Sequence, residues 1–489
     1  MIHGIEIVVL IPAAAALLCG LSRDERALSW ITILAAGACL AAAAWTFWPV
    51  FSTGTALEYG MWYVDGLSAL FLILTAAVTF AVALYSHGYL RFERAAGGLT
   101  LRAEKTYYIS LNLFVTAMLC VFLVSSLGMI WIIIEATTLV STFLVGFYRD
   151  EGSTEASWKY LIICSVGITL ALLGISLLYA SAIGVIGSVS SALDWPVLMS
   201  VAADLDPVLL KTAMALVIIG FGTKAGFAPM HTWLPDAHSQ APTPVSALLS
   251  AALLNCALYS IIRFYMISEI AIPGFASTLL LIFGIASVFV ASMFILNAKE
   301  LKRMLAYSSV EHIGLIAVGL GIGTTWSVFA ALFMVVAHSL TKPILFFCAG
   351  NIIQGYGTKE MSAVRGLGKT MPYTAAMLTV GSLAIVGMPP FAVFTGEIAL
   401  LYSAVSAGMW WLTILLVVLL IIIFAGFTGR VFPMLSGSAE AEVTEPEGPI
   451  RAAPLAILAV AMTAMGLFAP ESVADGFRMI AESMIGGLA

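Results

Sequence analysis

The apolar run Ala213–Ile219 leads into the stretch Gly220-Phe221-Gly222-Thr223-Lys224-Ala225-Gly226-Phe227-Ala228-Pro229. A charged residue at the centre of a membrane helix costs roughly 2.5–3.5 kcal/mol on insertion scales. The glycines and the proline also break the helix, so that freed backbone groups need new partners. A chain retains such a charge where the charge is used, and ion transport is the usual use. We therefore expect Lys224 to belong to an ion-transport pathway.

The composition is that of a membrane protein. The chain has 489 residues, of which 61% are hydrophobic and 10% charged, and its mean hydropathy is +1.06. Soluble domains carry about 25% charged residues, so we predict a polytopic membrane protein without a soluble domain. The net charge of −6 argues against nucleic-acid binding. The six cysteines form no C-x-x-C motif, so we expect neither a metal nor another cofactor in this chain.

Fourteen hydrophobic segments reach spanning length, which predicts an all-α fold. Their approximate limits are 4–21, 28–48, 65–87, 106–126, 128–148, 157–182, 206–229, 240–265, 274–297, 303–322, 325–349, 373–400, 408–429 and 451–469. The first segment is expected to be a retained helix, because no Lys or Arg precedes it.

Loop charges orient these segments. Lys and Arg cluster after helices 1, 3, 5, 9, 11 and 13, whereas the loops after helices 2, 4, 6, 10 and 12 carry none. Positive loops stay in the cytoplasm, so we predict that both termini lie outside the cytoplasmic (inner) membrane of a prokaryote. Lys211, Arg263 and Arg478 are exceptions on the outer side, and the loop after helix 7 lacks the expected charge.

The sequence also indicates an internal repeat, because two of the predicted helices are interrupted by glycine and proline. Helix 7 breaks at 220–229, and helix 12 breaks at Gly387-Met388-Pro389-Pro390-Phe391, shortly before Glu397. An offset of five helices inverts topology, and paired broken helices are typical of inverted-repeat transporters. We predict two inverted five-helix repeats, helices 4–8 and 9–13, with discontinuous helices 7 and 12. The expected parts of the chain are 1–105, 106–265, 266–430 and 431–489.

Glu135 stands alone among isoleucines and must be neutral or paired. It either forms a structural ion pair with Lys159 or Lys224, or it controls whether Lys224 holds its proton. Lysine suits such a role better than arginine, which does not deprotonate usefully.

Further titratable residues extend the set of candidates. His338 and Lys342 are four apart on one helix face and can pass protons through water; the alternative for His338 is a satisfied interior histidine. Glu397 is either an exit carboxylate or a structural group. Four residues are candidates either for proton uptake and gating or for helix capping, namely Asp236, His238, Glu311 and His312. Asp65 is expected to mark the outer end of helix 3.

The C-terminal part offers weaker signals. The loop 436–449 is acidic and rich in small residues, which predicts a solvated linker. The tail 471–487 could form an interfacial amphipathic helix.

Taken together, these residues resemble the antiporter-like subunits of complex I, of Mrp-type cation/proton antiporters and of membrane-bound hydrogenases. The resemblance covers nearly the whole chain. It is carried by the block 220–246 with Leu234-Pro235-Asp236-Ala237-His238-Ser239, by Lys302-Arg303-Met304-Leu305-Ala306-Tyr307-Ser308-Ser309, and by Gly387-Met388-Pro389-Pro390. Residues 134–139 and 220–224 look most like the group of hydrogenase-4 component F, from complexes of the formate-hydrogenlyase type.

The resemblance implies a proton relay along Glu135, Lys224, His338, Lys342 and Glu397, with Lys159 beside the first pair. Other members place a titratable residue in helix 8 where Ser250 or Asn255 stands here. Transfer between Lys224 and His338 must then use water or hydrogen bonds from these neutral side chains.

The resemblance also implies the partners. They would be other membrane subunits, including further antiporter-like ones, and peripheral redox subunits that hold a NiFe centre and iron–sulfur clusters. We expect a proton-translocating subunit of a redox-driven complex, with no catalytic redox site of its own. Three alternatives stay open: a subunit of a Na⁺/H⁺ antiporter, a proton-conducting partner in inorganic-carbon uptake, and a non-conducting structural subunit.

Overall fold

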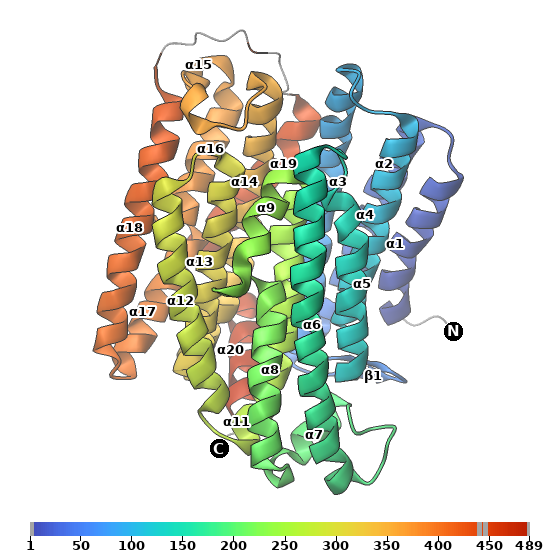
Figure 1. Cartoon of the computed structure of the whole chain (residues 1–489), viewed down its shortest axis with the longest axis vertical. Coiled ribbons are helices and arrows are strands. Elements are labelled where there is room, and N and C mark those ends of the chain that lie inside the picture. Colours follow the sequence, from blue (N-terminus) through green and yellow to red (C-terminus); the bar gives the residue numbers. More distant parts are fainter. Residues whose placement is uncertain (1–3, 438–442, 444–447, 487–489) are drawn as a thin grey trace.

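The computed structural model describes residues 4–437, 443 and 448–486, and it is a bundle of long helices (Figure 1). In this part of the chain, twelve helical segments are long and apolar enough to cross a membrane. The two other predicted segments correspond to α4 (Leu101–Val121) and to the shorter pair α16 (Pro372–Ile385) and α17 (Ala392–Ser406). The predicted all-α membrane fold is therefore confirmed.

The remaining long elements follow in chain order: α1 (Gly4–Leu21), α2 (Glu25–Thr53), α3 (Gly66–Ala95), α5 (Leu127–Val145), α6 (Glu151–Ile186), α8 (Pro207–Ala225), α9 (Trp233–Gln240), α10 (Thr243–Leu248), α11 (Leu254–Ala271), α12 (Phe275–Asn297), α13 (Leu301–Ile322), α14 (Thr325–Tyr356), α18 (Trp410–Leu435), α19 (Pro449–Leu467) and α20 (Glu471–Gly486). Short elements lie between them: β1 (Leu57–Tyr59), β2 (Trp62–Val64), α7 (Trp195–Ser200), η1 (Ala202–Asp204), η2 (Met230–Thr232), η3 (Leu249–Leu253), η4 (Met361–Ala363) and α15 (Leu367–Thr370).

Both predicted helix breaks are present. The first follows Ala225, where Gly226 takes φ +89, and the chain resumes in η2 and α9. The second follows Ile385, where Gly387 takes φ +68 before α17 begins. Figure 1 shows α8 and α9 rising through the bundle, whereas α16 and α17 descend. The two broken helices thus run in opposite directions, as inverted repeats require.

Small residues bring the helices of the first broken segment into close contact. A Cβ atom on Gly220 of α8 would lie 2.6 Å from the backbone nitrogen of Ala171 and from the carbonyl oxygen of Gly167, both on α6. Such glycine contacts let membrane helices approach at backbone distance. They fix α6 against α8 just before the turn that carries Lys224.

Two local features were not expected from the sequence. Strands β1 and β2 form an antiparallel hairpin between α2 and α3. Segment η3 is a π-helical turn between α10 and α11, so helix 8 is irregular at Ser250. Single π-turns of this kind occur frequently at functional sites.

Arg263, an exception to the predicted charge pattern, does not lie in a loop. It is 0% exposed on α11 and forms an ion pair with Asp65, the N-cap residue of α3. Its guanidinium also lies 3.9 Å above the ring centre of Trp195. Arg263 is therefore a structural charge that ties α11 to the start of α3, and Asp65 marks the end of helix 3 as expected.

The C-terminal tail forms helix α20 and docks on the bundle. Phe477 is 1% exposed and contacts the rings of Phe51, Phe329 and Phe333. One face of the expected amphipathic helix is thus covered by protein. Most of the predicted acidic linker, 438–442 and 444–447, lies outside the described residues.

Candidate functional site

Lys224 lies in the last turn of α8 and is 0% exposed. Its ammonium donates to Thr138 Oγ1 at 2.8 Å and to the hydroxyl of Tyr160 at 2.6 Å. The turn is held by the Trp233 indole, which donates to the Thr223 carbonyl at 2.8 Å. Among the described residues, no carboxylate lies within ion-pair distance of Lys224. Neutral hydroxyl groups therefore hold this amine.

Glu135 lies one helical turn from Thr138 on α5. Its Oε1 accepts a hydrogen bond from Ser165 at 2.7 Å, while its buried Oε2 has no partner. The direct Glu135–Lys224 ion pair is not formed: Glu135 accepts from Ser165, whereas Lys224 donates to Thr138 and Tyr160.

Lys159 is not beside this pair, which corrects the prediction. Its side chain is 47% exposed and bonds to Glu155 at 2.6 Å and Asp236 at 3.3 Å. Lys159 precedes Tyr160 directly, so the two point to different sides of α6. Asp236 also pairs with Arg303 at 2.8 Å. Asp236 thus joins α6 to α13 at one end of the bundle.

The capping interpretation fails for all four candidates. No side-chain hydrogen bond caps α10 at Pro242, which excludes Asp236 and His238 as its caps. Glu311 and His312 lie inside α13 rather than at its start. His238 is instead fully buried and stacks on Phe346 with ring centres 5.2 Å apart.

Lys302, which we counted as a loop charge, is also buried. It is 4% exposed, and its ammonium donates to the carbonyl oxygen of Ala241 at 2.5 Å. Ala241 follows α9, where the helical hydrogen-bond pattern ends. The lysine satisfies a carbonyl that the interruption leaves free.

The helix 8 residues Ser250 and Asn255 connect to the second half of the chain. Ser250 shares a 2.8 Å hydrogen bond with Ser309 of α13. Asn255 donates at 2.8 Å to Ser339 of α14, and its buried Oδ1 has no partner. Ser250 therefore ties helix 8 to α13, and Asn255 ties it to α14. A link from Lys224 to His338 through these two residues stays a prediction.

Lys342 and His338 lie beyond this link on α14, and both are 0% exposed. The Lys342 ammonium donates to the Leu305 carbonyl at 2.7 Å and to the Ser308 hydroxyl at 2.5 Å. The described residues give neither ring nitrogen of His338 a well-formed hydrogen bond, and the backbone of Ser250 lies beside the ring. Its ring lies 5.1 Å, centre to centre, from that of His312.

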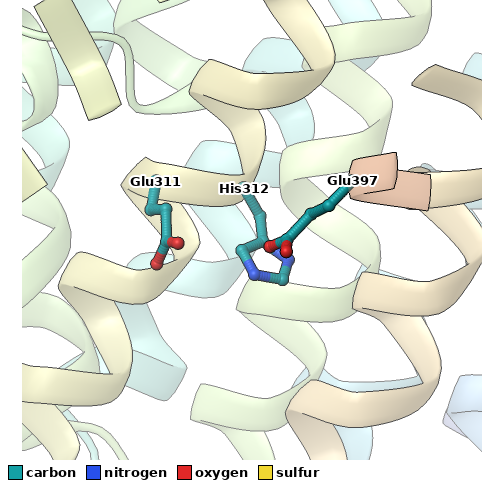
Figure 2. A group of neighbouring side chains, drawn as sticks. All are labelled: Glu311, His312 and Glu397. Atoms are coloured by element: carbon teal, nitrogen blue, oxygen red, sulfur yellow. The ribbon is translucent and has the colours of Figure 1, made fainter. Parts of the chain in front are cut away.

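Glu397 of α17 meets Glu311 and His312 of α13. One ligand-type atom from each side chain lies within 4.8 Å of the other two. Figure 2 shows Glu397 extending toward the His312 ring, with Glu311 on the far side of it. The sequence did not predict this cluster, because Glu397 and Glu311 are 86 positions apart.

We call the whole set the polar file. It comprises Glu135, Lys224 with its hydroxyl partners, the helix 8 residues Ser250 and Asn255, and then His338, Lys342 and the Glu397 cluster. Tyr160 was missed by the sequence analysis. No motif distinguishes it, because its role depends on the glycine contacts that place α6 against α8.

Comparisons with known proteins agree with this architecture. Residues 124–423 match the family model described as NADH:quinone oxidoreductase/Mrp antiporter, TM. The chain is 40% identical over 342 residues, 70% of its length, to the hydrogenase-4 component F homolog of Methylacidiphilum infernorum (isolate V4), and covers 72% of that protein.

Solved structures share the fold. A chain of the archaeal membrane-bound sulfane sulfur reductase superposes with a TM-score of 0.87 at 24% identity, covering 98% of this chain and 97% of that one. A chain of the Mrp complex from Dietzia sp. DQ12-45-1b gives 0.85 at 21% identity, covering 99% and 97%.

Proposed function

Because the chain belongs to the NADH:quinone oxidoreductase/Mrp antiporter family of membrane subunits, we propose that it moves protons along the polar file. The observation that supports this most directly is the environment of Lys224. A fully buried amine that is held by hydroxyl groups, with no carboxylate bonded to it, can exist with or without its proton. A lysine in a tight ion pair would stay charged.

Glu135 provides the means of control. It lies one helical turn from Thr138, which accepts from the Lys224 ammonium, and no direct bond fixes Glu135 and Lys224 together. A small displacement of Glu135 would change how strongly Lys224 holds its proton, because the interaction depends on distance in a medium of low dielectric constant. We propose that a partner subunit causes this displacement.

We further propose that the partner belongs to a redox-driven complex of the hydrogenase-4 or formate-hydrogenlyase type, in which the NiFe centre and iron–sulfur clusters lie in other subunits. The 40% identity to the component F homolog supports this assignment. The proteins that co-purify with the chain test it. Hydrogenase and ferredoxin-like subunits are expected, whereas a set of small antiporter subunits would point to a cation/proton antiporter.

The relay itself is tested by Lys224→Ala and Glu135→Ala in the assembled complex. Both variants should assemble but lose proton pumping in membrane vesicles. Lys211→Ala is the matched control, because Lys211 is an exposed lysine on the same helix. Pumping at the wild-type rate in both variants would exclude the relay.

A further inference from the structure

The Glu311–His312–Glu397 cluster contains hydrogen-bond acceptors with no donor. His312 Nε2 lies 3.1 Å from the carbonyl oxygen of Ile385. A carbonyl only accepts, so Nε2 carries the hydrogen and neutral His312 presents the lone pair of Nδ1 to the cluster. Nδ1 has no partner within the described residues.

The two carboxylates complete this acceptor set. Glu311 is 1% exposed and Glu397 is 7% exposed. In the part of the chain that the structure describes, both oxygens of Glu311 and the Oε1 of Glu397 lack a hydrogen-bond partner. Lys342, the nearest cation on α14, directs its ammonium to Leu305 and Ser308 instead. Buried charges of this kind are paired, neutralised by protons, or bound to a metal ion.

The second helix break shapes the cluster. Ile385 is the last residue of α16, so its carbonyl is one that the break leaves free for His312. The Glu397 carboxylate packs on Gly387 so closely that an added Cβ would overlap its Oε2. The break therefore orients two of the three side chains.

We propose that Glu311, His312 and Glu397 form a binding site for a divalent ion of the zinc class. Two carboxylates and a neutral imidazole are a donor set that zinc accepts, and together with Zn²⁺ they are electrically neutral, as a membrane interior favours. Metal-binding histidines usually donate their other N–H to a carbonyl or carboxylate, which His312 does at Ile385.

Other ions fit less well. A monovalent ion leaves one carboxylate uncompensated, and Na⁺ gains little from an imidazole nitrogen. Magnesium and calcium prefer oxygen ligands, so the imidazole of His312 contributes little to binding either ion. Zinc bonds of about 2.0–2.2 Å require the three donors to lie closer together than the 4.8 Å within which they are found, so zinc binding would draw the three side chains inward.

Metal binding is tested on the purified full-length chain in detergent, without a polyhistidine tag. After incubation with Zn²⁺ or Co²⁺ and removal of free ion, the wild type should retain one equivalent more than Glu311→Gln and Glu397→Gln. Bound Co²⁺ should also give visible absorption bands that both variants lack. His231→Asn is the control, because His231 is buried elsewhere, against Phe294 and Tyr307, and it should bind metal like the wild type.

Melting temperatures show whether a variant that binds no metal is still folded. Zn²⁺ should raise the melting temperature of the wild type and of His231→Asn but not of the two glutamine variants, because an ion that binds only the folded state stabilises it. Equal metal content and equal melting shifts in all four proteins would overturn the proposal, as would a wild type that binds no metal.

A consequence for transport rests on the proposed function. Bound zinc would occupy Glu397 and should inhibit proton flux in vesicles that contain the wild-type complex. If zinc binds but the wild type shows no flux, the metal site stands and the transport proposal fails. If zinc binds and flux is unaffected, Glu397 lies outside the proton path.

Discussion

Lys224 is a buried lysine whose direct hydrogen-bond partners are uncharged. Two hydroxyl groups and the backbone of a broken helix hold it at membrane depth. From the sequence, Lys224 was expected to be functional because a charge inside a membrane helix costs free energy. Glu135 was expected to be its partner, and the structure does not place the two in contact. The contacts that replace Glu135 come from Thr138 and Tyr160.

Tyr160→Phe should weaken transport without preventing folding. The change removes the 2.6 Å hydrogen bond that Lys224 donates to Tyr160 and the 2.6 Å hydrogen bond that Tyr160 shares with Ser141. A hydrogen bond to a charged group contributes about 1.5–3 kcal/mol, and about 1.4 kcal/mol corresponds to a tenfold change in rate. We expect proton flux in vesicles to fall about tenfold or more. Tyr179→Phe, a partly exposed tyrosine on the same helix, should keep the wild-type flux, and unchanged flux in Tyr160→Phe would remove Tyr160 from the relay.

Asp65→Asn should destabilise the protein in a pH-dependent way. Arg263 donates to both oxygens of Asp65, at 2.8 and 2.5 Å, and the Ser68 amide donates at 2.9 Å. Burial acts to raise the pKa of Asp65, but the charge and hydrogen bonds of Arg263 outweigh it and lower that pKa. Breaking a buried pair costs about 3–5 kcal/mol, because Arg263 is left unpaired.

The sign of the pH effect follows from the lowered pKa. The stability that Asp65 provides is complete above the unfolded-state pKa of about 3.9 and is lost as the pH falls through the lower folded value. Thermal unfolding of the wild type and Asp65→Asn in detergent should differ by a constant amount between pH 5 and 8, and the difference should shrink below pH 4. If the stability difference between the wild type and Asp65→Asn stayed the same below pH 4, the charge of Asp65 would not be its cause.

The helix breaks are the elements that the sequence predicted best. Glycine and proline act locally, so Gly226, Gly387 and the adjoining prolines indicate the interruptions without knowledge of the fold. The π-turn η3 and the β1–β2 hairpin depend instead on packing against distant helices, and no local pattern indicates them. The capping roles considered for Glu311 and His312 failed because an apolar run gives no sharp signal of where a buried helix begins.

Gly387→Ala tests whether the second helix break matters for transport because it positions Glu397, rather than only because its backbone conformation requires glycine. Gly387 has φ +68, where a side chain costs about 1–2 kcal/mol, and its new Cβ would push the Glu397 carboxylate aside. Gly408→Ala is the matched control, with φ +74 and open space around an added Cβ. Both variants should lose similar stability in thermal unfolding, but only Gly387→Ala should lose proton flux. Equal flux in the two would show that the position of Glu397 is unimportant.

At the scale of the whole molecule, the sequence predicted which residues form the polar file but not their contacts. Helices in the interior of the bundle are apolar on all sides, so periodicity does not fix their rotation. Contacts such as Ser250–Ser309 and Glu311–Glu397 depend on that rotation. The predicted position of Lys159 beside Glu135 and Lys224 was wrong because the rotation of α6 was not known. Tyr160 is buried, whereas Lys159, its neighbour in sequence, lies on an exposed face of the helix.

The helix 8 link decides whether the two halves of the polar file act as one path. Asn255 of α11 donates to Ser339 of α14, the helix that carries His338, and it is hydrogen-bonded to neither Lys224 nor His338. Asn255→Leu keeps a similar volume but removes the polar bridge, so we expect proton flux to fall at least tenfold while Lys224 and the Glu397 cluster stay intact. Ser260→Ala on the same helix is the control, since its hydroxyl donates only to the backbone of Cys256. If Asn255→Leu pumps like Ser260→Ala, protons do not cross through Asn255, and the two halves must conduct separately.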